Sequence, residues 1–202
     1  MPRRTALKPA LPARDRILEA ASRRFSKNSY DATGLRDIAA DARVDVAYVH
    51  RCFGSKERLF AEALAATVGP DRLLTGSGDT VAQSLAKQLF AHDAAEDINP
   101  LDIVIRSLTN PDAARVLREF ILQDFVSPLA EKVERPMQLR AALIAAFLAG
   151  VGIFRNVLRI KPLLETEGGQ VERLILNTVT NMMRAGSTVE RVGTTKRIER
   201  VQ

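Results

Sequence analysis

Residues 33–60, TGLRDIAADARVDVAYVHRCFGSKERLF, constrain the fold of this chain more than any other stretch. From Leu35 to Ala42 the apolar side chains recur at spacings of three and four residues, which is the period of a helix. A short turn follows at 42–44. The carboxylate of Asp45 then has the chemistry of a helix N-cap, since it can accept hydrogen bonds from backbone N–H groups that lack a partner. Two short helices joined by a turn of this length form a helix-turn-helix.

The second helix of the motif is expected over residues 46–53, with one apolar face turned inward and the opposite face open to solvent. A helix of this size fits the major groove of DNA, where each base pair presents a distinct pattern of donors and acceptors. Arginine pairs bidentately with guanine, and alanine or tyrosine can touch the methyl group of thymine. The outward residues that we expect to contact base edges are Ala47, Tyr48 and Arg51.

Further polar residues around the motif are candidates for contacts with the phosphate backbone. Thr33, with Gly34 as the alternative, is expected to cap the first helix of the motif, and helix N-termini attract anions. Lys56 stands at the start of the helix that follows the motif. The alternative for Arg36 and Lys56 is a solvated surface charge, and for His50 it is packing against the preceding helix. The complete set of candidate DNA-binding residues is Thr33, Gly34, Arg36, Arg43, Asp45, Ala47, Tyr48, His50, Arg51 and Lys56.

The positive charge of the chain is concentrated around this motif. The protein has a net charge of +6, with 30 Lys and Arg residues against 24 Asp and Glu. Residues 1–60 contain 13 basic and 7 acidic residues, whereas residues 61–202 contain 17 of each. A basic segment attracts the phosphate backbone whatever the base sequence. A modest excess of charge can also serve only to keep a protein dispersed, but its confinement to this segment favours nucleic acid as the partner.

Composition favours an all-α fold. The chain of 202 residues has no Trp, its apolar residues are mostly Ala, Leu, Val and Ile, and it shows no sustained alternating strand pattern. Cys52 is the only cysteine, so no internal disulfide can form and a reducing cytoplasm is the expected compartment. We expect Cys52 to be a small buried apolar residue. No apolar run marks a signal peptide, and the longest uncharged stretch, Ala141 to Phe154, is shorter than a bilayer span, so no membrane partner is expected.

About nine helices are expected, in four segments of the chain. Residues 1–12 are predicted to be a flexible basic arm, for which a minor-groove contact and simple disorder remain alternatives. Residues 13–54 form the predicted three-helix DNA-binding domain, residues 55–186 a larger helical domain for effector binding and dimerisation, and residues 187–202 a disordered tail. The expected helices are 13–27, 35–42, 46–53, 55–67, one capped by Asp79 or Thr80 after a loop at 69–78, one from Pro100, 111–132 with a kink at Pro128, 136–160 ending before Pro162, and 170–184.

The helix expected over 136–160 is apolar nearly all round between Ala141 and Phe154, whereas a surface helix needs only one apolar stripe. A partner subunit is the simplest cover, because this helix and the one at 170–184 from each of two chains would form a four-helix bundle. The alternative is that it is the central helix of its own domain. The candidate dimer-interface residues are Leu143, Phe147, Val151, Phe154, Leu174, Ile175, Thr178 and Met182.

Residues 14–60 resemble the DNA-binding domain of the TetR family of bacterial transcriptional regulators. The remainder resembles the family in its helix count, and FRNVLRIKPL, Phe154 to Leu163, is similar to the late helix of one C-terminal subgroup. The chain departs from the family pattern at Ser29 and Arg43, where glycines are usual, and at His50 and Cys52. The resemblance rests on Ile17-Leu18, Ala20-Ala21, Phe25, Tyr30, Thr33, Ile38-Ala39, Val44, Phe53 and Ser55-Lys56-Glu57.

The resemblance implies an effector site among the middle helices, usually for an apolar or amphipathic small molecule. It also implies a repressor that leaves a palindromic operator when the ligand favours a dimer whose recognition helices no longer match the DNA. Polar groups in or beside apolar helix runs are the candidates for orienting such a ligand, with surface exposure or an internal salt bridge as the alternative for each. They are His92, Asp102, Arg106, Gln123, Asp124, Arg155 and Asn156, with Phe147 as an apolar wall.

Catalysis finds little support in the sequence. The chain has two histidines, one cysteine, no Gly-rich phosphate loop and no nucleophile elbow, so we expect no enzyme, no metal site and no cofactor. Two other interpretations remain open. One is an architectural or division-type DNA-binding protein that responds to no ligand, and the other is a helical ligand-carrying dimer that does not bind DNA.

Overall fold

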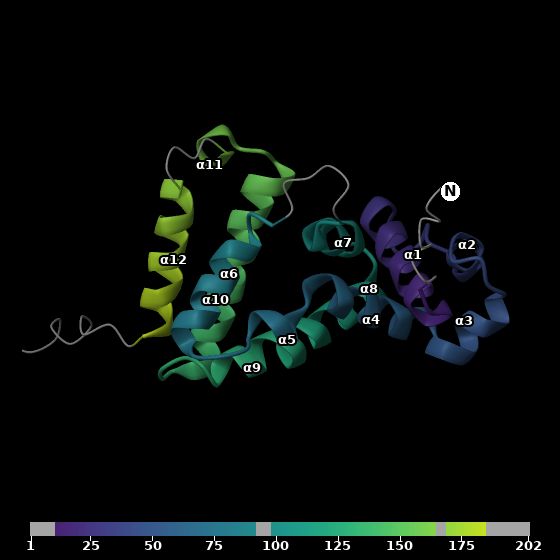
Figure 1. The fold of residues 1–202 in the computed structure, drawn as a ribbon, viewed down its shortest axis with the longest axis horizontal. Helices are drawn as coiled ribbons and strands as arrows, with labels where there is room; N and C mark the ends of the chain where they lie inside the picture. The colour runs from purple at the N-terminus through teal and green to yellow at the C-terminus, as the bar shows by residue number, and fades with distance from the viewer. Residues whose placement is uncertain (1–10, 92–97, 165–168, 185–202) are drawn as a thin grey trace, which may run out of the picture.

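The structure is a computed structural model that describes residues 11–91, 98–164 and 169–184, and within these ranges every regular element is a helix (Figure 1). The all-α prediction is confirmed. The predicted arm before Leu11, the predicted pocket residue His92 and the predicted tail lie outside the described residues.

The N-terminal helices are α1 (Ala13–Lys27), α2 (Leu35–Asp41), α3 (Val46–Phe53) and α4 (Lys56–Val68). Helices α2 and α3 with the turn between them form the predicted helix-turn-helix, and α1 and α4 pack against each other behind it. The bounds of α1 and α3 are those expected from the sequence, because each has a clear break signal at both ends.

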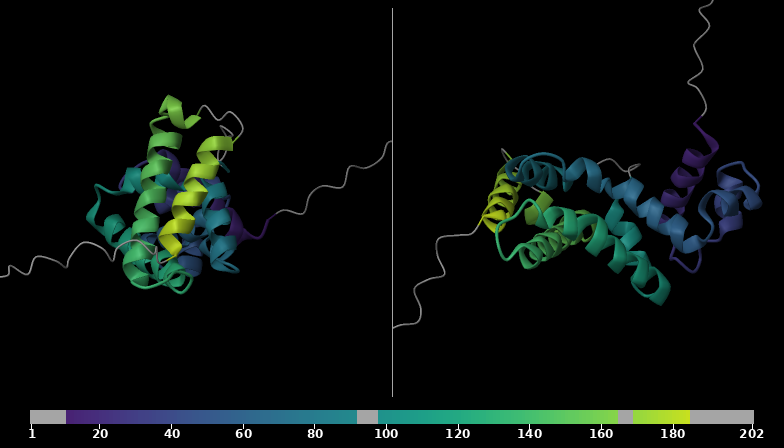
Figure 2. Two further views of the ribbon diagram at one scale, coloured as in Figure 1. Left: turned by 90° about the vertical axis from the view of Figure 1, so that its left-hand side faces the viewer. Right: turned by 90° about the horizontal axis from the view of Figure 1, so that it is seen from below.

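The larger half of the molecule continues from α4 and ends with α10 and α12 side by side, at the end opposite to α1–α3 (Figures 1 and 2). Its elements are α5 (Pro70–Leu73), α6 (Gly78–Gln88), α7 (Pro100–Ser107), α8 (Pro111–Phe120), the π-helical segment η1 (Ile121–Val126), α9 (Ser127–Ala130), α10 (Met137–Gly152), the π-helical segment η2 (Ile153–Val157), α11 (Lys161–Leu164) and α12 (Gln170–Met183).

Several helix ends differ from the prediction. The loop expected at 69–78 contains the one-turn helix α5, which begins at Pro70, a residue suited to the first helical position. Helix α6 starts earlier than expected, because the hydroxyl of Ser77, and not Asp79 or Thr80, accepts the hydrogen bond that caps it. The short helix α11 follows the break at which the preceding helix was expected to stop.

The long helix expected over 111–132 consists of three consecutive helical segments, α8, η1 and α9, and its middle segment η1 is π-helical. The reason lies in Pro128, which has no N–H to donate to the carbonyl of Asp124 and whose ring crowds that carbonyl. The predicted kink therefore takes the form of a widened helical turn. Widened turns of this kind often occur at functional sites.

Two apolar cores hold the described chain together. The first joins α1–α4 to α7 and α8, and in it the rings of Phe25 and Phe60 meet edge to face with centroids 4.9 Å apart. It includes Ile103 and Leu117, so the helix-turn-helix shares a core with helices beyond the domain boundary that we proposed at residue 54. The second core lies between α6, α9, α10 and α12.

Helix α10 and η2 form one continuous apolar helix, Met137–Val157, which is long and apolar enough to cross a membrane by length and composition alone. Only 22% of its most apolar stretch is buried within the chain. One side of it packs on α12, and Arg140 donates to the carbonyl oxygens of Met182 and Arg184 at the end of that helix. Leu139, Leu143 and Phe154 are exposed along the remainder of this helix.

Candidate DNA-binding surface and ligand cavity

The second helix of the motif, α3, is fixed at its start by its own cap. The Asp45 carboxylate accepts a hydrogen bond from the backbone N–H of Ala47 over 2.6 Å, as the sequence predicts. Val49 and Phe53 are buried against α1 and α2, so the opposite side of α3 must face solvent. Ala47 and Arg51 are exposed on that side.

Tyr48 completes the outward strip of α3 and is half-buried. The Arg51 guanidinium lies 5.3 Å from the centre of its ring, and hydrogen bonding to the thiol of Cys52 raises the pKa of the Tyr48 hydroxyl. A tyrosine hydroxyl can donate as well as accept a hydrogen bond. Cys52 is half-buried and not fully buried as expected, because it lies at the edge of this strip.

The turn of the motif closes on an arginine where glycine would be unstrained. Arg43 has φ 54°, in the left-handed region that L residues rarely adopt. The turn is held there by a hydrogen bond from the Val44 N–H to the Ala39 carbonyl over 3.0 Å. In addition, Arg16 on α1 donates to the carbonyl of Ala42 over 3.1 Å. The turn between α2 and α3 is thus hydrogen-bonded to α1.

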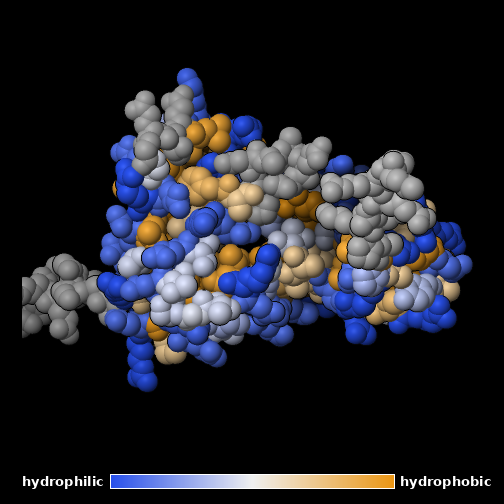
Figure 3. Space-filling model, in the orientation of Figure 1, coloured by the Kyte–Doolittle hydropathy of each residue, from blue (hydrophilic) through white to orange (hydrophobic). Residues whose placement is uncertain are grey.

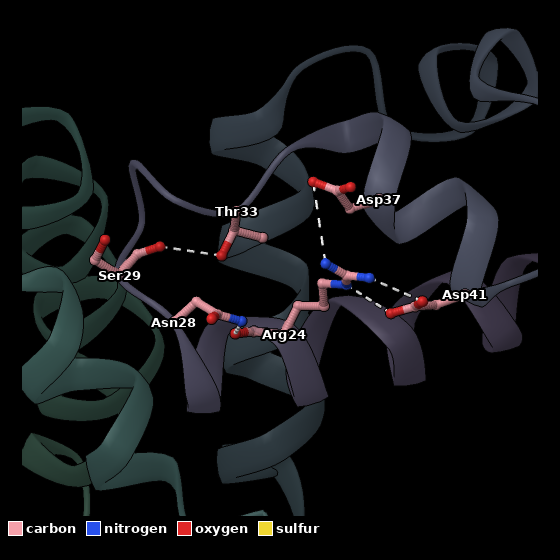
Figure 4. Close-up of polar contacts among 6 residues, drawn as sticks. All are labelled: Arg24, Asn28, Ser29, Thr33, Asp37 and Asp41. Atoms are coloured by element: carbon pink, nitrogen blue, oxygen red, sulfur yellow. Dashed lines mark hydrogen bonds and ion pairs between the residues drawn. The ribbon is translucent and has the colours of Figure 1, made fainter.

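An ion pair that the sequence analysis missed clamps α2 onto α1 (Figure 4). The Nε and Nη2 of Arg24 donate to the two carboxylate oxygens of Asp41 over 2.6 and 2.9 Å, and Asp37 lies 4.0 Å from the same guanidinium. This pairing lowers the pKa of Asp41. Arg24 and Asp41 are far enough apart in sequence that only knowledge of how α1 and α2 pack could have linked them.

Thr33 has a different role from the one predicted. The N-cap of α2 is Gly34, the alternative that we considered, and no side chain caps that helix. The Thr33 side chain is fully buried, and its hydroxyl donates to the carbonyl of Ser29 over 3.0 Å, inside the loop between α1 and α2 (Figure 4). The phosphate contact that we expected from its hydroxyl is therefore wrong, because the group is inaccessible and already bonded.

Lys56 begins α4 and is half-buried. Its ammonium lies 4.2 Å from the centre of the Tyr30 ring, and burial lowers its pKa. Glu57 beside it accepts hydrogen bonds from its own backbone N–H and from the Ser55 hydroxyl, which lower the pKa of its carboxyl. Lys56 is therefore held by a cation–π contact, which places a defined positive charge beside the start of a helix.

The remaining candidates reach the surface. Gly34 is half-buried at the start of α2, and His50 is exposed, with its Nδ1 3.3 Å from the carbonyl oxygen of Gly54. Asp45 has its capping task and remains open to solvent. The exposed members of the predicted set are Arg36, Arg43, Asp45, Ala47, His50 and Arg51.

Comparison with known proteins shows which protein family this chain belongs to. Residues 17–63 match the family described as "Bacterial regulatory proteins, tetR family", and residues 79–183 match "Tetracyclin repressor-like, C-terminal domain". The chain belongs to the TetR family. It is 26% identical over 142 residues to the HTH-type nicotine-responsive transcriptional repressor HdnoR of Paenarthrobacter nicotinovorans, an alignment that covers 64% of this chain and 73% of that protein.

Solved structures share the TetR fold. A TetR-family regulator from Streptomyces coelicolor A3 has a TM-score of 0.54 and 24% identity, covering 87% of this chain and 99% of that one. The fatty acid degradation regulator FadR from Bacillus halodurans has a TM-score of 0.61 and 16% identity, covering 86% and 97%. By its family, the protein is a DNA-binding transcriptional regulator and not an enzyme, and the members of this family bind operator DNA as dimers.

The C-terminal half of this TetR-family chain contains a cavity of about 450 Å³. Its walls come from α6, α7, α8, η1, α10 and η2, together with Val68 of α4 and Leu73 of α5. This volume is in the range of sites for small molecules. Almost all of the lining is aliphatic or aromatic, and the polar residues among it are Gln88, Asn99 and Asn156.

The polar candidates proposed from the sequence are not the residues that line this cavity, Asn156 excepted. Gln123 and Asp124 are exposed, and Arg106 is turned outward toward α1. Arg155 is buried but donates to the carbonyl of Leu89 and does not face the cavity. The described candidates that prove wrong for this cavity are Asp102, Arg106, Gln123, Asp124, Phe147 and Arg155.

Proposed function

We propose that the protein is a repressor that binds a palindromic operator as a homodimer in the cytoplasm and leaves it when a small, largely apolar ligand enters the cavity. Repression is the mode named for its relative HdnoR. The outward strip of Ala47, Tyr48 and Arg51 would contact base edges. Arg36, Arg43, His50 and Lys56 would contact phosphate, since each is basic or titratable and reaches the surface beside that strip.

The observation that supports ligand control is the position of α7 and α8 between the cavity and the helix-turn-helix. Leu101 and Val104 of α7 line the cavity, while the same helix packs along α1. Leu117 and Phe120 of α8 line it as well, and α8 packs on α4. A ligand that moves either helix would therefore move α1 or α4, the two helices that support the recognition helix.

The dimer that we propose uses the uncovered sides of α10 and α12. Leu143 and Phe154 of α10 and η2 are 52% and 53% exposed, and Leu174 of α12 is 59% exposed. Figure 3 shows apolar residues among hydrophilic ones on the surface of this half. Ile175 is a wrong choice for the interface, because it is 4% exposed and belongs to the second core of its own chain. The half-buried candidates Phe147, Val151, Thr178 and Met182 remain at the edge of this surface.

Symmetry then gives the operator its form. Two copies of α3 related by a two-fold axis read two half-sites about one helical turn, roughly 34 Å, apart on one face of the duplex. The ligand acts only if it binds more tightly to a dimer in which this spacing is lost, since a ligand with equal affinity for both states shifts nothing.

Selection of bound sequences from a random DNA pool tests the proposal, followed by a screen for compounds that release the best sequence. We expect one palindromic consensus and release by an apolar compound. Protection of many unrelated sites would indicate the architectural alternative. No DNA binding even at low salt would indicate a ligand carrier, and either result would overturn the proposed repressor.

A further inference from the structure

The amide groups of the cavity are gathered at one end of it. Asn156 on η2 donates from Nδ2 to the carbonyl of Leu89, which is the neighbour of Gln88. Asn99 precedes α7, whose Leu101 packs so closely on Gly152 that an added Cβ there would lie 2.5 Å from the Leu101 Cδ1 and 3.3 Å from the Leu89 Cδ2. The end of α6, the start of α7 and η2 therefore meet at the polar end of an otherwise apolar space.

The hydrogen bonds already formed at this end determine which donors and acceptors remain free for a ligand. The Oδ1 of Asn99 accepts from the backbone N–H of Leu101 over 3.0 Å, as the cap of α7. The Oδ1 of Asn156 accepts from the Arg155 Nη1 over 2.8 Å. Each amide oxygen already accepts one hydrogen bond, and Asn156 gives one of its N–H groups to Leu89, so the two side chains retain both N–H donors of Asn99 and one of Asn156. The Gln88 amide has no hydrogen-bond partner among the described residues.

The charges near this end of the cavity bear on whether a ligand's head group is ionised or neutral. None of the described residues that line the cavity is charged. The nearby Arg155 guanidinium is occupied by the Leu89 carbonyl, by Asn156 and by the face of the Phe90 ring, 4.2 Å away. An ionised head group would lose its hydration on entering this apolar space, and none of the described lining residues offers it an opposite charge. A cationic head group would lie near the Arg155 cation, and an anionic one would meet only a guanidinium that already contacts Leu89, Asn156 and Phe90, so a neutral head group is favoured.

We propose that the effector is a neutral amphiphile whose polar head is a hydrogen-bond acceptor, a carbonyl of the ketone, lactone or amide type, held by Gln88, Asn99 and Asn156. Its apolar body fills the aliphatic part of the cavity. This inference rests on the proposed function only in calling the bound molecule an effector. The cavity and its amides define the ligand class whether or not binding releases DNA.

Three amphiphiles of matched length test the head-group preference: methyl decyl ketone, dodecanoate and dodecylamine. Each competes with the neutral fluorescent dye N-phenyl-1-naphthylamine for the full-length protein at neutral pH. We expect the ketone to bind at least on the order of tenfold more tightly than either charged amphiphile. Equal or tighter binding of dodecanoate or dodecylamine, or failure of the ketone to displace the dye, would overturn the proposal.

A substitution of Gln88 makes the test specific to the polar end. Gln88→Lys supplies a cation, so dodecanoate should gain affinity while the ketone loses it. Gln83→Lys on the exposed side of the same helix adds the same charge outside the cavity and should leave both unchanged. If the two variants behave alike, Gln88 does not contact the head group and the assignment fails. If both unfold, Gln88→Leu takes their place and must weaken the ketone without weakening dodecylbenzene.

Release of the selected operator is measured separately. Tight binding of the ketone without release of DNA would leave the ligand class standing and overturn the proposed ligand control. Release by a charged compound that competes with the dye, with no binding of the ketone, would support ligand control and overturn the ligand class.

Discussion

The Nε of Arg106 on α7 donates a hydrogen bond to the carbonyl oxygen of Ser26 on α1 over 2.9 Å. The side chain reaches out of the regulatory half and holds the last turn of the first DNA-binding helix, where carbonyls lack partners within the helix. A second bridge, from the Asn110 Nδ2 to the Asp31 carboxylate over 2.7 Å, ties the start of α8 to the loop after α1. Both helices line the cavity, so these bridges connect its walls to the DNA-binding half.

Removal of the Arg106 bridge should weaken the coupling between ligand and DNA. In Arg106→Ala, the factor by which saturating methyl decyl ketone weakens operator binding should fall by an amount equivalent to about 0.5–2 kcal/mol. The affinities for each ligand alone should change less, because the residue lies outside both sites. Fluorescence anisotropy of labelled operator with and without the ketone measures the factor. Arg118→Ala, an exposed arginine on α8, is the control, and an equal loss there would refute the role of Arg106.

The strained turn at Arg43 makes a prediction about stability. Arg43→Gly should be more stable than Arg43→Ala by about 1 kcal/mol, because glycine adopts φ 54° without the steric cost that any Cβ imposes there. Both variants remove the same charge, so the comparison isolates the backbone. Urea unfolding followed by circular dichroism gives the difference in the free energy of unfolding. Equal stability of the two would show that the turn relaxes away from the left-handed conformation.

The sequence was sufficient to predict the recognition half because its signals are local. Asp45 caps α3 and Ser55 caps α4 through groups two or three residues away, and the apolar period identifies the buried face of each helix. The prediction for Thr33 was wrong because it used the same local rule that succeeded for Asp45 and Ser55. A threonine before a helix has the chemistry of a cap, and only the packing of the loop on α1 shows that the side chain is buried.

The two kinds of DNA contact should respond differently to salt and to sequence. Arg51→Ala should cost about 1–3 kcal/mol on the selected operator and relax base preference at its position. Lys56→Ala should weaken binding to all sequences about equally and reduce the slope of log K against log salt by about 0.9 per phosphate contact. Titrations on operator and scrambled DNA at several salt concentrations separate the two. Wild-type behaviour of both variants would remove α3 and the start of α4 from the DNA-binding surface.

The clamp between α1 and α2 should depend on pH. Because pairing with Arg24 lowers the pKa of Asp41 in the folded protein, its contribution to stability is complete above the unfolded pKa of about 3.9 and is lost as pH falls through the folded value. Both side chains are partly exposed, so the coupling energy between Arg24→Gln and Asp41→Asn should be below about 1 kcal/mol at pH 7. It should vanish once the pH lies below the folded pKa of Asp41, where the carboxyl is protonated. A coupling energy that persists there would assign it to packing.

The cavity shows where sequence reasoning stops. A polar residue inside an apolar helix run is a reasonable candidate for a ligand contact, yet Asp102 and Gln123 point elsewhere, because one helical turn contains both an inward and an outward position. Asn99 lines the cavity, but its position in the sequence predicted only that a helix begins at the next residue. Gln88 also lines the cavity, and nothing in the sequence distinguished it from the polar residues around it. Which side of α6 faces α7 depends on tertiary packing, which no local pattern encodes.

The proposed dimer can be tested at a glycine. A Cβ added to Gly150 on α10 meets no atom within 4 Å in the single chain, so a larger residue there has room unless a partner subunit covers it. Gly150→Leu and Leu143→Lys should therefore shift the protein from dimer to monomer, the first by overfilling the interface and the second by burying a charge in it. Helical content should remain that of the wild type, and operator affinity should fall because one subunit reads only one half-site.

Sedimentation velocity measures the mass, with Leu108→Lys as the control, since Leu108 is 56% exposed at the end of α7, outside the proposed interface. A wild-type protein that sediments as a monomer, or dimers that persist in both variants, would place the interface elsewhere and leave the exposed apolar side of α10 without the cover proposed for it.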